Sequence, residues 1–188
     1  MLTVGIGWWV WRPTVAPVQP PASVQLPTPK PAPQPTGPSV AELAQVTPPE
    51  YRPPVLRGAE DDATQRFLAA MRHYVRGDYE AAIPGLRAAS KLNPQASDIS
   101  FFLGICYLLT DQTDAAIKQL GKTAALGDSP YLEETHFYLA KCSLSKGDLR
   151  AARNELEKTI RLHGECEGEA RELLQQVERL GKESHKPR

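Results

Sequence analysis

The sequence has no excess charge of either sign, because 22 lysines and arginines balance 22 aspartates and glutamates. This balance argues against a nucleic-acid partner, which usually requires a basic surface to displace counterions from phosphates. Cysteine is scarce as well, with only Cys106, Cys142 and Cys166 among 188 residues. A fold built on disulfides is therefore excluded, and the cysteines do not indicate a redox compartment.

Residues 1–12 begin with eleven uncharged, mostly apolar residues that include Trp8, Trp9 and Trp11, and end in Arg12. Eleven residues are too few to cross a hydrocarbon layer of ~30 Å, which requires ~20 residues in a helix. The basic start and small-residue cleavage site of a secretory signal peptide are also missing. An aromatic cluster followed by arginine is typical of a membrane segment at the interface. Two interpretations stay open: the end of a truncated membrane anchor, or a disordered apolar tail.

Proline dominates residues 13–57, since fourteen of the 18 prolines precede residue 55. Proline fixes φ and lacks an N–H group, so this stretch is predicted to be a mostly disordered, extended linker. Residues 39–46 could form two helical turns, which are too few to be stable alone in water. A proline-rich ligand for an aromatic groove is the alternative to a spacer, and the spacer is favoured because no aromatic or basic flank stands at motif spacing.

A repeated pattern begins after the linker. Residues 76–83 (RGDYEAAI), 110–117 (TDQTDAAI) and 146–153 (KGDLRAAR) align at intervals of 34 and 36 residues. Small residues recur in register at Ala70, Gly104 and Ala140, where paired helices must approach closely. The pattern resembles the tetratricopeptide repeat family, whose unit is a helix–turn–helix of 34 residues.

The resemblance implies an all-α fold, an α-solenoid of three such units. Residues 169–180 carry one apolar stripe opposite a charged face, so we expect a capping helix that covers the last unit. The repeat domain with its cap is predicted over residues 58–182, followed by a disordered tail at residues 183–188.

In this family the first helix of each unit lines a concave groove, which implies a set of ligand-binding positions. These positions are Phe67, Met71, Tyr74, Phe101, Ile105, Leu108, Leu109, Phe137, Lys141 and Leu144. We expect an apolar groove that docks a peptide or helix, so that Phe101→Glu abolishes capture and leaves helicity intact. Lys141 is the only cation of the set, which argues against the carboxylate-clamping adaptors of the family. The alternative is that the same side chains form core, covered by the chain's own N-terminal segment or a further helix.

Catalytic and metal-binding patterns are missing from the sequence. It has no glycine-rich phosphate loop and no serine elbow, and His163 with Cys166 lacks the second ligand pair of a structural zinc site. We therefore expect no enzyme, no metal and no cofactor.

The function predicted from the sequence is a non-catalytic protein–protein interaction module with a protein or peptide partner, tethered to a membrane. The alternative is a structural oligomerisation module whose groove is filled by its own chain or by a second copy. Analogy with bacterial envelope proteins of this architecture favours the envelope as its location, with the cytoplasm as the alternative.

Overall fold

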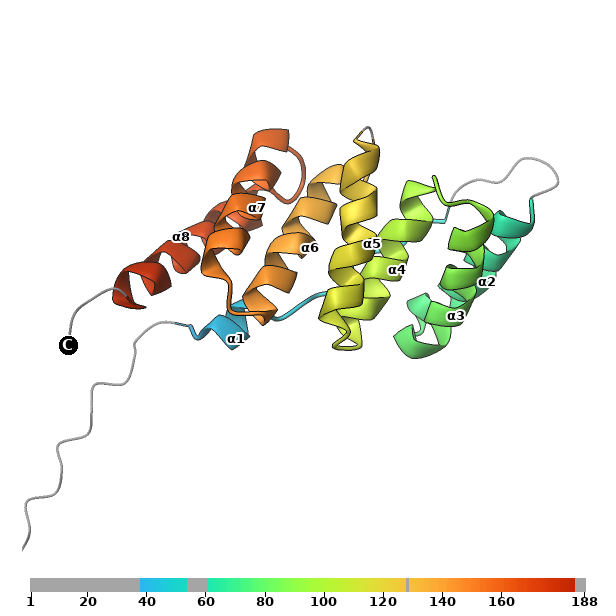
Figure 1. The fold of residues 1–188 in the computed structure, drawn as a ribbon, viewed down its shortest axis with the longest axis horizontal. Coiled ribbons are helices and arrows are strands. Elements are labelled where there is room, and N and C mark those ends of the chain that lie inside the picture. Colours follow the sequence, from blue (N-terminus) through green and yellow to red (C-terminus); the bar gives the residue numbers. More distant parts are fainter. Residues whose placement is uncertain (1–37, 54–60, 128, 185–188) are drawn as a thin grey trace, which may run out of the picture. The chain divides into compact units, whose positions relative to one another are not determined.

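Three helix pairs and a closing helix follow one another along the repeat domain (Figure 1). The computed structural model describes residues 38–53, 61–127 and 129–184. The expectations for residues 1–12, for linker residues 13–37 and 54–57 and for tail residues 185–188 lie outside these described residues. Residues 183 and 184, predicted as part of the tail, belong to the last helix. The pairs are α2 (Asp62–Val75) with α3 (Tyr79–Leu92), α4 (Ser97–Leu109) with α5 (Thr113–Leu126), and α6 (Leu132–Ser145) with α7 (Leu149–Leu162). Helix α8 (Glu167–Ser184) packs against α7, which confirms the predicted α-solenoid with its cap.

The turn inside each pair has a left-handed residue at the position that the repeat alignment marks. Gly77 and Gly147 have φ values of 79° and 73°, and Asp111 takes the same conformation with φ 58°. Glycine has no Cβ and aspartate is among the few residues that tolerate this region, so the chain can reverse here. The reversal brings the two helices of a unit into antiparallel contact.

Small and large residues of the second helices are both buried in the core. Leu86, Leu120 and Leu156 are fully buried, and so are Ala82, Ala116 and Ala152 on the same second helices. A Cβ atom on Gly104 would lie 2.8 Å from Leu120 Cγ, so glycine is required where α4 meets α5. The apolar stripe of α8 is buried through Ala170, Leu173 and Val177.

None of the helices in the described part of the chain is both long and apolar enough to cross a membrane.

Candidate functional site

The residues predicted to line the groove lie on the first helices of the three pairs, α2, α4 and α6. Nine of the ten are buried and Leu109 is half-buried. Phe67, Phe101 and Phe137, the recurring rings, are only 3%, 1% and 4% exposed. The face of these helices is therefore covered rather than open to solvent.

Residues of the chain itself provide cover for this face. Residues 39–51 belong to the stretch predicted as a spacer, but in the structure they lie on the repeats. Helix α1 (Val40–Leu43) contacts α6 and α8, and the trace that follows it runs on beside the repeats (Figure 1). We call residues 39–51 the covering segment.

A single turn of helix begins the covering segment. Ser39 and Glu42 form a capping box, in which each side chain accepts a hydrogen bond from the backbone N–H of the other residue. A helix this short is not stable alone in water. Leu43 is buried, and Val40, Ala44 and Val46 pack against the core, so tertiary contacts stabilise the turn.

Three side chains of the repeats donate hydrogen bonds to main-chain carbonyl groups of the covering segment. Lys141 Nζ on α6 lies 3.1 Å from the Leu43 carbonyl oxygen. The Tyr138 hydroxyl, also on α6, donates to the Thr47 carbonyl at 2.8 Å. The Tyr74 hydroxyl on α2 donates to the Pro49 carbonyl at 2.7 Å. The side chains of Thr47 and Pro49 take no part in these bonds. The hydrogen bonds therefore depend on the conformation of the backbone and not on the identity of these two residues.

An aromatic cluster holds the end of the covering segment. The Tyr51 ring packs edge-on against Phe67 and Phe102, with centroid distances of 5.9 Å and 5.4 Å. Phe102 also contacts the rings of Tyr74, Phe101 and Tyr131, which places it at the centre of the cluster. Edge-to-face pairs of this kind stabilise a contact by ~0.5–1.5 kcal/mol beyond the area that they bury.

On the first helices of the pairs, sequence reasoning missed Phe102 and Tyr138. Each directly follows a predicted groove residue and so lies about 100° further around its helix. The signal that could have revealed Phe102 is the composition of α4, which is apolar on all sides and therefore buried on all sides. More than one row of side chains on each first helix therefore lines this face.

Burial shifts the pKa of all three hydrogen-bond donors. It raises the pKa of Tyr74 and of Tyr138, so both hydroxyls stay protonated and can donate. Burial lowers the pKa of Lys141, and the carboxylate of Glu169 acts in the opposite direction. Lys141 Nζ also lies 5.4 Å from the centroid of the Phe137 ring, within range of a cation–π contact.

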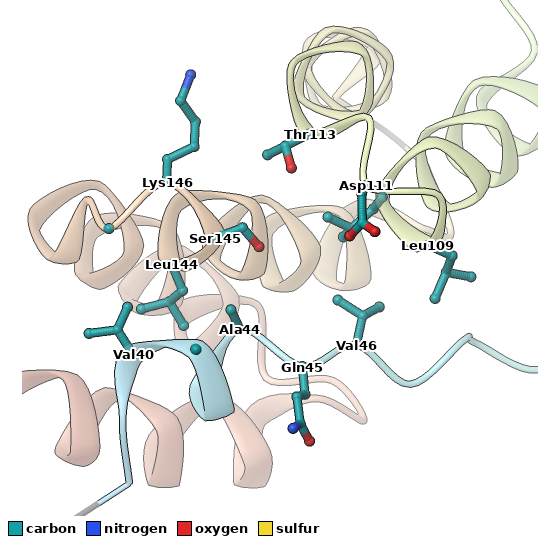
Figure 2. Close-up of a pocket in the computed structure, with 13 residues that line it drawn as sticks. Val40, Ala44, Gln45, Val46, Leu109, Asp111, Thr113, Leu144, Ser145 and Lys146 are labelled. Carbon is teal, nitrogen blue, oxygen red and sulfur yellow. The ribbon is translucent and has the colours of Figure 1, made fainter.

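A cavity of about 780 Å³ remains between the covering segment and the repeats. Figure 2 shows Val40, Ala44 and Val46 on one side, with Leu144 of α6 and Leu109 at the end of α4 on the other. Asp111 and Lys146 add charge from the turns after α4 and α6. The covering segment therefore does not fill the whole face on which it lies.

Removing one tyrosine hydroxyl should weaken the contact with the covering segment. We expect Tyr74→Phe and Tyr138→Phe each to lower the free energy of unfolding by about 1 kcal/mol, because a carbonyl loses its donor and the ring stays. Urea denaturation followed by circular dichroism measures this. Tyr107→Phe, the same change on α4 outside the covered face, is the control and should shift stability by less than ~0.5 kcal/mol. Equal effects of all three variants would contradict the assigned hydrogen bonds.

Comparisons with known proteins agree with this fold. Residues 67–132 match the tetratricopeptide repeat family. The Yersinia enterocolitica type III secretion chaperone SycD, in complex with a peptide of the translocator YopD, is 25% identical with a TM-score of 0.60. That alignment covers 66% of this chain and 97% of the chaperone. A second structure of SycD gives 26% identity and a TM-score of 0.59, covering 68% of this chain and 90% of that one.

Another solved structure shows a likeness of fold alone. PcrH of Pseudomonas aeruginosa, in complex with the chaperone binding region of PopD, is 21% identical with a TM-score of 0.60. The alignment covers 68% of this chain and 99% of PcrH. No curated protein matches the chain. The repeat pattern and the stacked helix pairs agree with the match of residues 67–132 to the tetratricopeptide repeat family.

Proposed function

We propose that this protein is a non-catalytic scaffold whose face formed by α2, α4 and α6 binds an extended peptide segment of a partner protein. One observation carries the proposal: the face already holds residues 39–51 of the chain as a peptide, through contacts from all three helices. The similarity to SycD, which is seen in complex with a peptide of YopD, supports the same use of the fold.

The chemistry of the face suits a peptide. Its donors bind carbonyl groups that every peptide carries, and its buried rings and aliphatic side chains accept apolar side chains from an incoming segment. Burying one such side chain contributes ~1.5–3 kcal/mol before the cost of ordering the segment. The proposal includes tethering to a membrane of the bacterial envelope, supported by Trp8, Trp9, Trp11 and Arg12 at the N-terminus.

A second candidate function follows from the same contact. If the covering segment never leaves, the face is internal core, and the domain is a structural or oligomerisation module without a separate ligand. The burial of Phe67 and Phe101 favours this alternative.

Peptide binding in trans separates the two functions. The probe is a fluorescein-labelled peptide of residues 38–53, and the protein is the full chain, either wild-type or with Leu43→Ala and Tyr51→Ala. We call this double substitution the opened variant. Because a tethered segment competes at an effective concentration near the millimolar range, the wild type should bind the peptide weakly. We expect the opened variant to bind it at least ~10-fold more tightly in fluorescence anisotropy, since its own segment has lost two apolar anchors.

A scrambled peptide is the control and should bind neither protein. An opened variant with native helicity that fails to bind the labelled peptide would refute the scaffold function and favour the structural module. Light scattering on the wild-type chain then reports whether that module is a dimer.

A further inference from the structure

We infer that the face formed by α2, α4 and α6 selects proline-containing, extended segments by binding their main-chain carbonyl groups between two apolar anchors. The covering segment is the internal example of this class of ligand. The inference rests on the proposed function and names the chemistry of the partner.

The hydrogen bonds define a spacing along the ligand. The bound carbonyl groups belong to Leu43, Thr47 and Pro49. With Leu43 as the first anchor, the other two lie at the fourth and the sixth residue after it. The ring of Tyr51 follows at the eighth. Residues 47, 49 and 51 are thus contacted at every second position, as expected for a chain in extended conformation. A ligand that continued as a helix would use these carbonyl groups in its own hydrogen bonds.

Proline fits the middle of this spacing for a physical reason. Thr47 is followed by Pro48 and Pro49. Proline has no N–H group and fixes φ, so this stretch cannot form a helix and its carbonyl groups stay free for outside donors. A preorganised segment also loses less conformational freedom on binding. Tyr138 and Tyr74, from helices α6 and α2, supply those donors.

The apolar side chains of the ligand contribute to the contact, since Val40, Ala44 and Val46 pack against the core, but its polar side chains do not. Leu43 is buried and Tyr51 packs on the aromatic cluster, whereas Gln45, Thr47 and Glu50 are exposed. Within the described residues, the Tyr51 hydroxyl is buried without a hydrogen-bond partner. The site therefore requires a ring at this position and not a hydroxyl group, so phenylalanine should serve as well as tyrosine.

The partner is accordingly a segment with an aliphatic residue that is followed by prolines five and six residues later and by an aromatic residue eight residues later. Its carbonyl groups accept hydrogen bonds from the same side chains, Lys141, Tyr138 and Tyr74, as those of the covering segment, so the two exclude each other. Binding of the partner requires the covering segment to leave.

The first arm of the test changes the protein. In the opened variant, Tyr74→Phe and Tyr138→Phe together should weaken binding of the labelled peptide of residues 38–53 by ~10-fold or more, because two carbonyl groups lose their donors. Tyr107→Phe, the matched control, should leave the affinity within about twofold.

The second arm changes the peptide and keeps the opened variant. Replacing Pro48 and Pro49 by alanine should weaken binding several-fold, because the free peptide becomes less ordered. Thr47→Ala with Glu50→Ala should keep the affinity within about twofold, and Tyr51→Phe should bind at least as tightly as the parent peptide.

The outcomes separate this inference from the proposed function. If the parent peptide binds but the two Tyr→Phe changes have no effect, carbonyl recognition is overturned and the scaffold function stands. If binding is lost with Tyr51→Phe, the requirement for a ring alone is overturned. If the wild-type chain forms a dimer that the peptide cannot dissociate, the occupant is a second copy and the assignment of an outside partner fails.

A second measurement applies if the opened variant loses helicity. A protease site is placed between residues 54 and 60 of the otherwise native chain, so that cleavage frees the covering segment without changing any contact residue. The labelled peptide should then exchange into the cleaved protein. Absence of exchange in a cleaved protein with native helicity would overturn the inference.

Discussion

Phe101→Glu is expected to unfold the repeat domain rather than to spare it. Phe101 is 1% exposed and stacks on the Tyr131 ring at a centroid distance of 4.8 Å. Loss of the ring costs about 3–5 kcal/mol, and a carboxylate buried without a partner adds several more. The sum is comparable to the whole stability of a small domain. The sequence-based expectation of intact helicity is therefore replaced by an expectation of lost helicity.

Circular dichroism at 222 nm and urea denaturation measure this result, with Phe101→Leu as the control. Leucine keeps an apolar side chain and should cost less than ~1.5 kcal/mol. Native helicity and an unchanged urea midpoint in Phe101→Glu would mean that the ring is not core, and that the face is open in solution.

Gly104→Ala is expected to have the second largest effect, a loss of about 2–4 kcal/mol in the free energy of unfolding. The added methyl group would lie 2.8 Å from Leu120 Cγ, 2.9 Å from Cδ2 and 3.2 Å from the Leu120 backbone nitrogen. Leu120 is fully buried, so it cannot move aside without disturbing the core. The strain should exceed the ~1 kcal/mol that alanine gains over glycine inside a helix.

Gly121→Ala is the matched control, one residue beyond Leu120 on the same helix. A Cβ atom on Gly121 meets nothing within 4 Å, and the residue is exposed. The same substitution should therefore raise the free energy of unfolding by about 0.5–1 kcal/mol. Chemical denaturation of both variants gives the comparison, and the same sign for both would contradict the close approach of α4 and α5.

Local signals account for the parts of the fold that the sequence predicts. The turn at Asp111 and the glycines at 77 and 147 stand at a fixed place in each unit, so the helix boundaries follow from the repeat. The stripe of α8 predicts the capping helix because apolar residues at helical spacing must face a neighbour. The family positions also assigned Phe67, Phe101 and Phe137 to the first helices of the three units, and in the structure they lie on α2, α4 and α6.

The aromatic cluster shows where such reasoning ends. Phe101 and Phe102 are neighbours in the sequence, and the repeat alignment marks only the first. Which ring becomes the centre of the cluster depends on Tyr51 and Tyr131, which arrive from other parts of the chain. No periodic pattern relates these positions.

The sequence by itself determined the helix pairs, their turns and their cap, because each depends on residues within one unit of 34–36 positions. Only the tertiary structure decided that residues 39–51 lie on the repeats. The bonds that hold this segment join Thr47 to Tyr138 and Leu43 to Lys141, which are 91 and 98 residues apart. The acceptors of these bonds are main-chain carbonyl groups, which every residue has. The pattern of side chains along the segment therefore cannot predict them.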